Sequence, residues 1–432
     1  MLSNNETAAF LDSLQKTGIK PGLTRIKHLM ARLGEPQHSF KSVLITGTNG
    51  KGSTAAFIHA MLRCAGLKVG LFTSPHLIDV RERIVIDGQM ISHELFNQCA
   101  MEVKAAMTTG ERPIRITFFE ALTAIGFLAF SKVGLDLAVV EVGMGGRLDS
   151  TNIIEPIVSV LTNVTVDHQA YLGNTVEKIG LEKIGVSRRG HTLVTAVDDD
   201  LFINTLGPAL KRRGVFVSRL NHDFHFNWAD TSGENAQLLD FKGPFSISGL
   251  ELGLKGKFQG ENAAVAMATV HELRCQGFTI KDEHIRSGLK SAHWPGRMEV
   301  LAKNPLLIVD GCHNPGAATK LAQTLEMMAL PIPRVMIHGS KPDKNYGKVL
   351  EALAPHFDAI IETTIPGLAD PSCVAAETNS LTGLHTLIAV EPDLQKALAL
   401  AKDLAKDNGS ILVTGSLYLV GAFLEHYRGK FE

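Results

Sequence analysis

The sequence contains few cysteines and gives them no recognisable spacing. Only five occur among 432 residues, namely Cys64, Cys99, Cys275, Cys312 and Cys373. Their number is odd, and their positions fit neither a disulfide framework nor a metal-binding motif. We therefore expect a cytoplasmic protein in which each cysteine is a small buried hydrophobic residue.

The sequence also lacks an excess of charge of either sign and lacks long hydrophobic runs. The 43 Lys and Arg residues balance the 44 Asp and Glu residues. No field from the whole chain therefore draws it to nucleic acid or to an anionic membrane. The longest apolar stretch, residues 116–130, is interrupted by Glu120 and is too short to cross a bilayer. The first six residues show neither the positive start nor the apolar run of a signal peptide. We expect a monomer with small-molecule partners, no nucleic-acid partner and no membrane.

What the sequence does contain is an alternation of buried strands and helices, which indicates an α/β fold with parallel sheets. At 432 residues the chain is longer than one hydrophobic core usually serves, so we expect two domains. The Pro295-Gly296 pair interrupts regular structure and places the boundary between residues 1–296 and residues 297–432. A β-rich excursion from the first domain is expected at about residues 198–254. The first domain should contain strands at 42–46, 68–72, 135–142 and 157–161 and helices at 53–64, 118–130 and 262–273; the second should contain strands at 306–309, 334–338, 359–361 and 411–414 and helices at 317–328, 348–353 and 394–405.

A glycine-rich stretch lies between the first expected strand and the first expected helix. It reads Gly47-Thr48-Asn49-Gly50-Lys51-Gly52-Ser53-Thr54. Glycines let backbone N–H groups converge on phosphate oxygens, Lys51 supplies a positive charge near the β- and γ-phosphates, and a hydroxyl of Ser53 or Thr54 can contact Mg²⁺. Fewer residues separate the first two glycines than in G-x-x-x-x-G-K-[ST], and Gly52 is extra. The alternative is a glycine-rich turn without a ligand.

A second glycine-rich stretch, residues 141–152, begins with a carboxylate at the end of an apolar strand. Ligands bind at this end of the strands in open α/β sheets. Burying Glu141 is costly unless its carboxylate is paired or binds a metal ion. Glu141 is therefore a candidate Mg²⁺ ligand, and the alternative is an ion pair with an arginine beneath a plain turn.

Four other polar residues stand out, and three of them have a structural alternative. The Ser74 hydroxyl follows the second strand, at the same expected sheet edge. Asp310 follows a strand of the second domain and could accept hydrogen bonds from ribose hydroxyls, or else form an Asx-turn and cap a helix. His168 and Lys183 belong to no pattern of their own, so composition favours a structural histidine and a solvated lysine.

Together these motifs resemble the folylpolyglutamate synthases, including their bifunctional dihydrofolate synthase form, within the Mur ligase superfamily. The resemblance extends from about residue 22 to residue 418 and rests on residues 47–54 and on Glu141-Val142-Gly143-Met144-Gly145-Gly146-Arg147-Leu148-Asp149-Ser150-Thr151-Asn152. It implies a central P-loop-containing, Mur-ligase-like domain with a parallel sheet, followed by a smaller Rossmann-like α/β domain. It also implies ATP- and Mg²⁺-dependent ligation of L-glutamate to the carboxylate of a folate or of dihydropteroate.

The resemblance further implies roles for single residues. Ser74, Glu141 and His168 are similar to the family's Mg²⁺ ligands, for which two ion sites are expected. Lys183 is similar to its carbamylated lysine, N6-carboxylysine, whose negative charge would orient the second ion. The implied catalytic residues are Lys51, Lys183 and His313. The implied ATP contacts are Thr48, Asn49, Gly50, Lys51, Gly52, Ser53, Thr54, Asn262, Arg297 and Asp310, and the implied folate or pterin contacts are Thr117, Phe118, Phe119, Glu120, Leu148, Asp149 and Ser150.

Three positions depart from the family pattern. Lys183 is followed by Ile184-Gly185-Val186, where the family usually has Ala-Gly-Ile. Cys312 replaces an alanine in the Asp-x-Ala-His-Asn-Pro motif that contains His313. Lys20 lies near a position where bifunctional members often have an acidic residue. A folylpolyglutamate synthase without dihydropteroate activity is therefore the alternative.

The implied reaction begins when a substrate carboxylate attacks the γ-phosphorus of ATP to give an acyl phosphate, from which the amine of glutamate then displaces phosphate. Closure of the two domains about Pro295-Gly296 would keep the acyl phosphate dry. Three rival functions remain. A peptidoglycan-type Mur ligase needs a preceding domain, but only 46 residues come before Gly47. A P-loop kinase leaves the second domain and the Glu141 motif unexplained, and the third rival is a nucleotide-gated binding module without catalysis.

Overall fold

The computed structural model describes residues 4–109, 112–229, 238–342, 344–381 and 387–428, and these divide into two compact units. Unit 1 comprises Met1–His76, Val80–Gly253 and Gly260–Ala292. Unit 2 comprises Leu77–Asp79, Leu254–Gln259 and His293–Glu432. The main break therefore lies just before the expected boundary at 296/297, and two short earlier segments also belong to unit 2.

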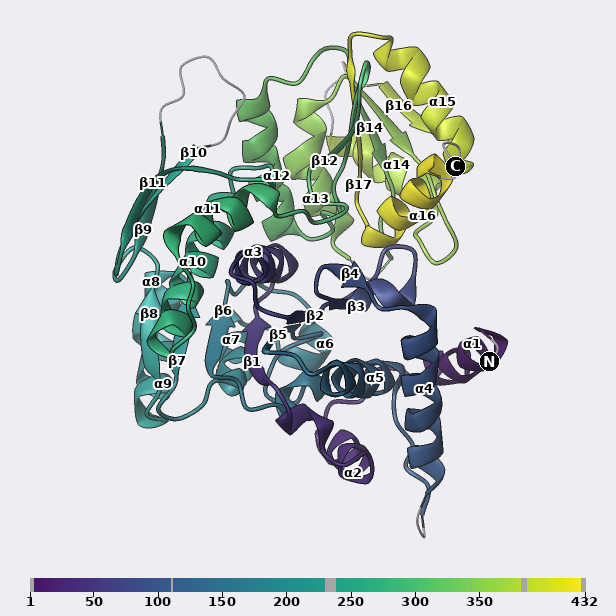
Figure 1. The fold of residues 1–432 in the computed structure, drawn as a ribbon. Helices are drawn as coiled ribbons and strands as arrows, with labels where there is room; N and C mark the ends of the chain where they lie inside the picture. Colours follow the sequence, from purple (N-terminus) through teal and green to yellow (C-terminus); the bar gives the residue numbers. More distant parts are fainter. Residues whose placement is uncertain (1–3, 110–111, 230–237, 343, 382–386, 429–432) are drawn as a thin grey trace. The chain divides into compact units, whose positions relative to one another are not determined.

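The centre of unit 1 is a sheet in which most strands run parallel (Figure 1). Among the described residues its strand order is β4-β3-β2-β5-β1-β6-β7-β8. From β2 to β8 in this order all neighbours are parallel, whereas β3 and β4 pair antiparallel. The bounds are β1 (Lys41–Thr46), β2 (Val69–Phe72), β3 (Ile84–Ile86), β4 (Gln89–Met90), β5 (Leu137–Glu141), β6 (Val158–Leu161), β7 (Thr192–Thr195) and β8 (Phe216–Arg219). The four strands expected for this domain are confirmed as β1, β2, β5 and β6.

Helices cover both faces of this sheet. On one face α3 (Lys51–Cys64) packs against the central strands, and α11 (Asp282–Ser291) packs on α3. Gly288 permits this close approach, because a Cβ there would lie 2.4 Å from Cα of Met61. On the other face α5 (Phe118–Val133) and α4 (His93–Thr108) bury a large apolar cluster. Unit 1 also contains α1 (Asn4–Gln15), α2 (Thr24–Arg32), α6 (Gln169–Leu172), α7 (Val176–Lys183) and α10 (Gln259–Cys275), the last of which begins in unit 2.

The β-rich excursion expected at residues 198–254 is only partly right. Its first part is helical, with α8 (Asp199–Leu201), the π-helical turn η5 (Phe202–Leu206) and α9 (Gly207–Arg212), and β8 then joins the main sheet. A separate antiparallel sheet is formed by β9 (His225–Trp228), β10 (Leu238–Lys242) and β11 (Ser246–Glu251), in the order β11-β10-β9. A π-turn shifts the helical period and so obscures the apolar spacing of this segment. Residues 230–237 of the excursion lie outside the described residues.

Unit 2 is a second α/β unit built on its own sheet. Within the described chain its strand order is β12-β13-β17-β14-β15-β16, and all neighbours are parallel except β12 and β13. The strands are β12 (Glu299–Lys303), β13 (Leu306–Val309), β14 (Arg334–His338), β15 (Ala359–Glu362), β16 (Leu387–Val390) and β17 (Ser410–Thr414). The helices are α12 (Pro315–Met328), α13 (Tyr346–Leu353), α14 (Pro371–Leu381), α15 (Leu394–Ala405) and α16 (Leu417–Arg428). The expected strands and helices of this domain are confirmed, and the structure adds β12, β16, α14 and α16.

The expectation that all five cysteines are buried is wrong. Cys99 and Cys312 are buried, but Cys64, Cys275 and Cys373 are exposed. Cys64 and Cys275 are the last residues of α3 and α10, and Cys373 lies in the first turn of α14. Helix ends meet solvent more often than helix centres, which explains the exposure.

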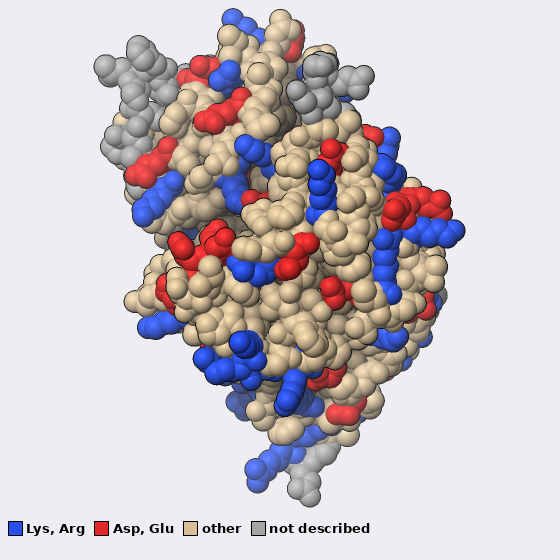
Figure 2. Space-filling model, turned by 90° about the vertical axis from the view of Figure 1, so that its left-hand side faces the viewer, with Lys and Arg blue, Asp and Glu red and all other residues tan. Residues whose placement is uncertain are grey.

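Two surface properties bear on the partners of the chain. In the described part, no helix combines the length and apolarity needed to span a bilayer. On the face drawn in Figure 2, Lys and Arg side chains are interspersed with Asp and Glu side chains. That face therefore presents no continuous stripe of positive charge.

Candidate active site

Four neighbouring strands bring the candidate residues of unit 1 to one sheet edge. The strands β2, β5, β1 and β6 are adjacent and parallel, so their carboxyl ends lie at the same edge. Ser74 follows β2, Glu141 ends β5, and the glycine-rich loop follows β1. The loop of residues 162–165 follows β6. These residues are far apart in the sequence, and the order of the parallel strands brings them together at one sheet edge.

At two positions of the glycine-rich loop, any residue other than glycine would clash with a neighbouring side chain. Gly50 is the N-cap of α3, with φ 81°, and a Cβ there would lie 2.4 Å from Oδ1 of Asn262. A Cβ on Gly47 would lie 1.9 Å from the hydroxyl oxygen of Thr162. Thr54, one turn into α3, donates a long hydrogen bond of 3.5 Å from its hydroxyl to Asn262 Oδ1. The loop thus leads directly into a helix N-terminus, whose N–H groups and dipole favour an anion.

The loop after β6 holds the glycine-rich loop in place. The Asn49 backbone N–H donates to Asn163 Oδ1 at 3.0 Å, and Asn163 Nδ2 donates to the Asn49 carbonyl at 3.0 Å. The Thr162 hydroxyl donates to the same carbonyl at 2.6 Å. Thr165 N–H donates to the Thr48 hydroxyl at 3.0 Å. Sequence reasoning missed Thr162, Asn163 and Thr165, although their place directly after a buried strand is the same signal that pointed to Ser74.

Lys51 and Glu141 face each other beside this loop. The Lys51 ammonium nitrogen lies 4.0 Å from Glu141 Oε1 and donates to the Thr48 carbonyl at 3.1 Å. The other carboxylate oxygen, Oε2, accepts a hydrogen bond of 3.2 Å from the Ser74 backbone N–H. Glu141 is buried, so its charge is compensated by these partners and not by bulk water. Lys51 is thus a basic partner of Glu141, in addition to the arginine that the sequence offered as an alternative.

Lys183 lies beneath the glycine-rich loop. Its ammonium nitrogen donates to the Gly47 carbonyl at 2.8 Å, and only 3% of the residue is exposed. Burial, and after it the positive charge of Lys51, lowers the pKa of Lys183 to about 7. Composition alone favoured a solvated lysine, and that interpretation is wrong. The side chain is buried because it ends α7 and extends from there under the loop.

A small hollow of about 20 Å³ lies between these groups, with room for about one water molecule or ion. His168, in the left-handed backbone region with φ 51°, lines it from the N-terminus of α6. Asp167 accepts from the His168 backbone N–H at 2.8 Å, and its other oxygen lies 3.9 Å from His168 Nε2. The hollow is lined by Gly47, Thr48, Lys51, Gly143, Met144, Gly145, Asp167, His168, Leu172 and Lys183.

The expected metal ligands are brought together only in part. Ser74 and Glu141 are hydrogen-bonded, and His168 lines the hollow next to Lys51. Over the described residues no three His, Cys, Asp or Glu side chains gather in an arrangement suited to a metal ion. Carboxylate and hydroxyl oxygens are the donors that Mg²⁺ prefers, and Glu141 with Ser53 or Ser74 would supply them.

The residues expected to contact the pterin or folate line a neighbouring part of unit 1. Thr117 and Glu120 form a capping box at the start of α5, and the Arg25 guanidinium donates to both oxygens of Glu120 at 3.1 and 3.2 Å. The Phe119 ring packs closely on Gly143: a Cβ on Gly143 would lie 2.5 Å from the ring of Phe119. Arg83 stacks over the Phe118 ring with 5.8 Å between the guanidinium carbon and the ring centroid. The buried carboxylate of Glu120 is thus engaged by its own helix and by Arg25.

The 148–150 segment belongs to the same region and mainly supports the second glycine-rich loop. The buried Asp149 carboxylate accepts from Met144 N–H at 2.9 Å and from the Thr151 N–H and hydroxyl at 3.0 and 2.6 Å. Burial raises the pKa of Asp149, and these hydrogen bonds oppose the rise. The Ser150 hydroxyl lies 2.9 Å from that of Thr123 on α5, and the Leu148 carbonyl accepts from Gly22 N–H at 3.2 Å.

In unit 2 the carboxylate of Asp310, an expected ATP contact, accepts hydrogen bonds from backbone N–H groups. Its carboxylate accepts from Met298 N–H at 3.0 Å and from Cys312 N–H at 2.9 Å, which is the Asx-turn named as the alternative. Burial raises the pKa of Asp310, and the nearby Arg297 opposes this. His313 follows in the same loop and shares a hydrogen bond of 2.9 Å between its Nδ1 and the Gly311 carbonyl. Asn314, and not Asp310, caps α12.

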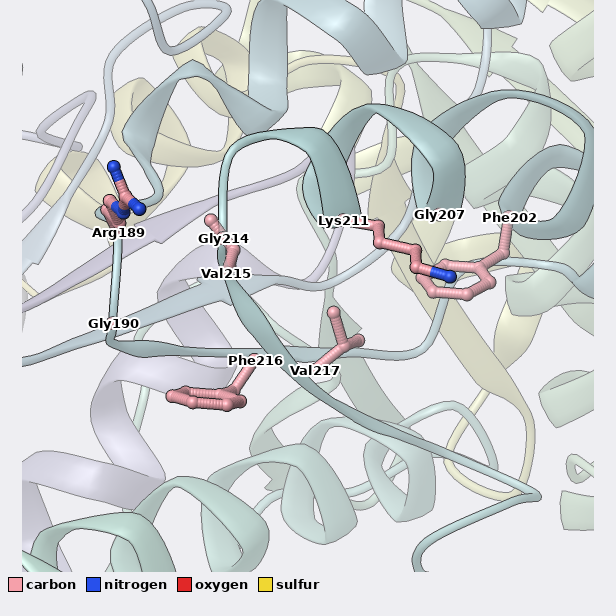
Figure 3. Close-up of a pocket in the computed structure, with 9 residues that line it drawn as sticks. All are labelled: Arg189, Gly190, Phe202, Gly207, Lys211, Gly214, Val215, Phe216 and Val217. Carbon is pink, nitrogen blue, oxygen red and sulfur yellow. The ribbon is translucent and has the colours of Figure 1, made fainter.

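A larger hollow of about 680 Å³ opens at the edge strand β8 (Figure 3). Figure 3 shows the Phe216 and Val217 side chains on one side of it and Phe202 with Lys211 on the other. None of the expected site residues lines it, and its charged residues are Arg189 and Lys211. It is therefore separate from the candidate active site.

Comparison with known families decides the relationship of the chain. Residues 45–270 match the Mur ligase middle domain, and residues 296–417 match the Mur ligase, glutamate ligase domain. The chain belongs to the Mur ligase family. The first match contains the candidate residues of unit 1, and the second contains Arg297, Asp310 and His313.

Within the Mur ligase family the chain belongs with the folylpolyglutamate and dihydrofolate synthases. It is 35% identical to the dihydrofolate synthase/folylpolyglutamate synthase of Bacillus subtilis over 418 residues, which is 94% of each chain. It is 34% identical to a probable bifunctional folylpolyglutamate synthase/dihydropteroate synthase of Haloferax volcanii, with 96% of the present chain covered. The chain spans about half the length of this relative and of the corresponding protein of Halobacterium salinarum, 49% and 51% respectively. The structure of Escherichia coli FolC in complex with DHPP and ADP superposes with a TM-score of 0.89 at 27% identity, covering 99% of this chain and 98% of that one.

Proposed function

We propose that this Mur ligase family member is an ATP-dependent ligase that joins L-glutamate to the carboxylate of a folate, and also to that of dihydropteroate, through an acyl phosphate. One observation carries the proposal. The Lys51 ammonium lies 4.0 Å from the Glu141 carboxylate at the sheet edge where the glycine-rich loop enters α3. The similar structure of Escherichia coli FolC, in complex with DHPP and ADP, supports a nucleotide as a ligand.

The phosphates of ATP would lie against the glycine-rich loop. Backbone N–H groups at the N-terminus of α3, after Asn49, would bind the anionic oxygens, and Lys51 would neutralise charge on the γ-phosphate during transfer. Asn262, which touches Gly50, would complete the nucleotide contacts of unit 1. In unit 2, Arg297 and Asp310 would serve the nucleotide, with Asp310 acting chiefly by ordering the backbone around Arg297.

Glu141, Ser74 and His168 would hold Mg²⁺, with the Ser53 hydroxyl as a further oxygen donor. When bound, Mg²⁺ would supply positive charge to the β- and γ-phosphate oxygens. Glu141 fits this task because its buried carboxylate already compensates the charge of Lys51. Ser74 fits because its backbone orients Glu141 Oε2.

Lys183 would be carbamylated. In this step its neutral amine nitrogen forms a bond to the carbon of CO₂ and loses a proton to solvent, giving a carbamate anion. A pKa of about 7 supports the step, because about half of the amine is then neutral at pH 7. The product would place a negative charge near Lys51 and so orient a second Mg²⁺.

The ligation needs positioning more than covalent help from the protein. The folate or pteroate carboxylate oxygen attacks the γ-phosphorus and ADP leaves. The glutamate nitrogen then attacks the acyl carbon, loses a proton, and phosphate leaves as the amide forms. Phe118, Phe119 and the 148–150 segment would contact the pterin, and His313 of unit 2 would act on the glutamate side.

Phosphate release with ATP and glutamate, measured with tetrahydrofolate and with dihydropteroate in turn, tests the proposal. Release that requires glutamate with either acceptor is expected. Glutamate-dependent release with tetrahydrofolate but not with dihydropteroate would support the monofunctional alternative. Phosphoryl transfer that does not need glutamate would support a kinase. Nucleotide binding without any phosphate release would support a binding module. The cytoplasmic location and the monomeric state remain predictions.

A further inference from the structure

A row of buried polar residues crosses the sheet of unit 2 at the carboxyl ends of its strands. Glu362 ends β15, His338 ends β14 and Thr414 ends β17, and the backbone register pairs His338 with both of the others. Asp310 follows β13, and its N–H donates to the Val413 carbonyl at 3.0 Å, which sets it level with Thr414. All four are buried. Residues two positions earlier on these strands belong to one apolar cluster, so the four side chains lie on the same sheet face.

His338 and Glu362 form a fully enclosed pair within this row. His338 Nδ1 lies 2.8 Å from Glu362 Oε2, and neither side chain is exposed. The second carboxylate oxygen lies 3.2 Å from the Thr378 hydroxyl on α14, whose single proton is shared with the Val374 carbonyl at 2.8 Å. Because a carboxylate accepts, Nδ1 carries the proton that forms this bond. Glu362 and Thr378 therefore fix the plane of the imidazole ring.

The far edge of that ring packs on Gly415. A Cβ at Gly415 would lie 2.5 Å from Cδ2 and 2.7 Å from Nε2 of His338, and φ of Gly415 is 106°. The turn after β17 therefore follows its path only because glycine leaves space for the ring. His338 Nε2 and the Thr414 hydroxyl are buried and have no hydrogen-bond partner among the residues described.

This turn is joined to the loop that carries His313. Gly415 N–H donates to the Cys312 carbonyl at 3.1 Å, and Gly339 N–H, next to His338, donates to the Thr414 carbonyl at 3.3 Å. One backbone hydrogen bond therefore links the turn beside the His338 ring to Cys312, the residue before His313. A buried polar pair is a poor source of stability compared with apolar residues of similar size, which favours a role in placing the turn.

We propose that His338, oriented by Glu362 and Thr378, is a positioning residue for glutamate binding. It holds the turn of residues 414–416 and, through Cys312, the loop of residues 310–314 in the geometry that receives the amino acid. The inference rests on the proposed function, in which unit 2 supplies the glutamate side of the reaction. It concerns the glutamate subsite and leaves the glycine-rich loop of unit 1 unaffected.

Steady-state kinetics of His338→Asn test the proposal. The asparagine amide can still donate to Glu362, but it lacks the ring edge that packs on Gly415. We expect the KM for glutamate to rise at least about tenfold while the KM for ATP changes less than about twofold. His356→Asn, in the same unit and far along the chain from the turn, is the matched control and should leave both constants unchanged.

Each outcome decides the matter. A lower kcat in proportion to a smaller folded fraction, with unchanged KM values, would give His338 a structural role only and overturn the proposal, as would unchanged kinetics. If His338→Asn does not fold, the isosteric Thr378→Val replaces it: a raised KM for glutamate supports the proposal, and an unchanged one contradicts it. Wild-type protein without any glutamate-dependent phosphate release would refute the proposed function itself, which separates that failure from a failure at His338.

Discussion

The ammonium nitrogen of Lys51, the first residue of α3, lies 4.0 Å from Oε1 of Glu141, the last residue of β5. Under the proposed function, Lys51 would bind the triphosphate and Glu141 its metal ion. The same two residues, removed singly, therefore give the most informative change in chemistry.

Lys51→Ala and Glu141→Ala should each lower kcat for glutamate-dependent phosphate release by about a hundredfold or more, because each removes charge stabilisation in the transferring phosphoryl group. Circular dichroism should show both variants folded. The surface pair Lys132–Glu102, 3.1 Å apart, offers matched controls, and Lys132→Ala and Glu102→Ala should retain full activity. Near-normal turnover in Lys51→Ala or Glu141→Ala would remove the basis of the proposed function.

Lys183 should acquire a carbamate that depends on pH. Burial lowers its pKa to about 7, so the neutral, CO₂-reactive amine becomes dominant as the pH rises through about 7. A ¹³C NMR carbamate signal should therefore grow with ¹³C-bicarbonate between about pH 6 and pH 8. Lys183→Ala should lose both the signal and most activity, and short carboxylates should restore part of the activity. The exposed Lys178→Ala, on the same helix, should keep both; full activity in unsupplemented Lys183→Ala would reject the carbamate.

His59 should make the protein sensitive to mild acid. It is buried in α3, and burial, followed by the charge of Arg63, lowers its pKa from 6.5 to about 4. Between these values the unfolded chain binds more protons than the folded chain. The free energy of unfolding should therefore fall as the pH is lowered from about 6.5 to about 4, by up to roughly 3 kcal/mol.

Chemical denaturation across this pH range measures the effect. His59→Gln cannot titrate and should show a flatter pH dependence, whereas the exposed His93→Gln should behave as the wild type does. An unchanged slope in His59→Gln would mean that other groups cause the acid sensitivity.

Arg25 should affect the folate side of the reaction and spare the ATP side. Its guanidinium holds the buried Glu120 carboxylate at the start of α5, next to the phenylalanines expected to contact the pterin. Arg25→Gln should raise the KM for tetrahydrofolate about tenfold and leave the KM for ATP within about twofold. The exposed Lys27→Gln, on the same helix, is the control, and an equal rise in both KM values would argue for general disorder.

The fold was predictable where the spacing of apolar residues agrees with the positions of the glycines that end strands and helices. The strand before Gly47 is a continuous apolar run, the glycines end it, and the helix that follows has regular apolar spacing, so β1 and α3 lie where expected. The segment after Asp198 was not predictable in this way, because a π-turn interrupts its period. Exposure of Cys64 and Cys275 depends on helix ends, which the sequence places only to within a few residues.

The sequence predicted the site residues that lie at the ends of strands. It did not predict the hydrogen bonds that hold the glycine-rich loop in place. Glu141 and Ser74 were found because parallel strands bring their carboxyl ends together. Thr162 and Asn163 also follow a buried strand, but they were missed because their role is to hold Asn49, and that contact appears only in three dimensions. Lys183 could be placed only by resemblance, since nothing in an isolated lysine reveals that its amine is buried.

The acyl phosphate is the centre of the account, and an oxygen-transfer experiment tests it most directly. Tetrahydrofolate labelled with ¹⁸O in its reacting carboxylate, incubated with the enzyme, ATP and glutamate, should yield phosphate that contains one ¹⁸O atom for each amide formed. Amide formation that releases only unlabelled phosphate, or labelled substrate that is never consumed in the presence of glutamate, would contradict it.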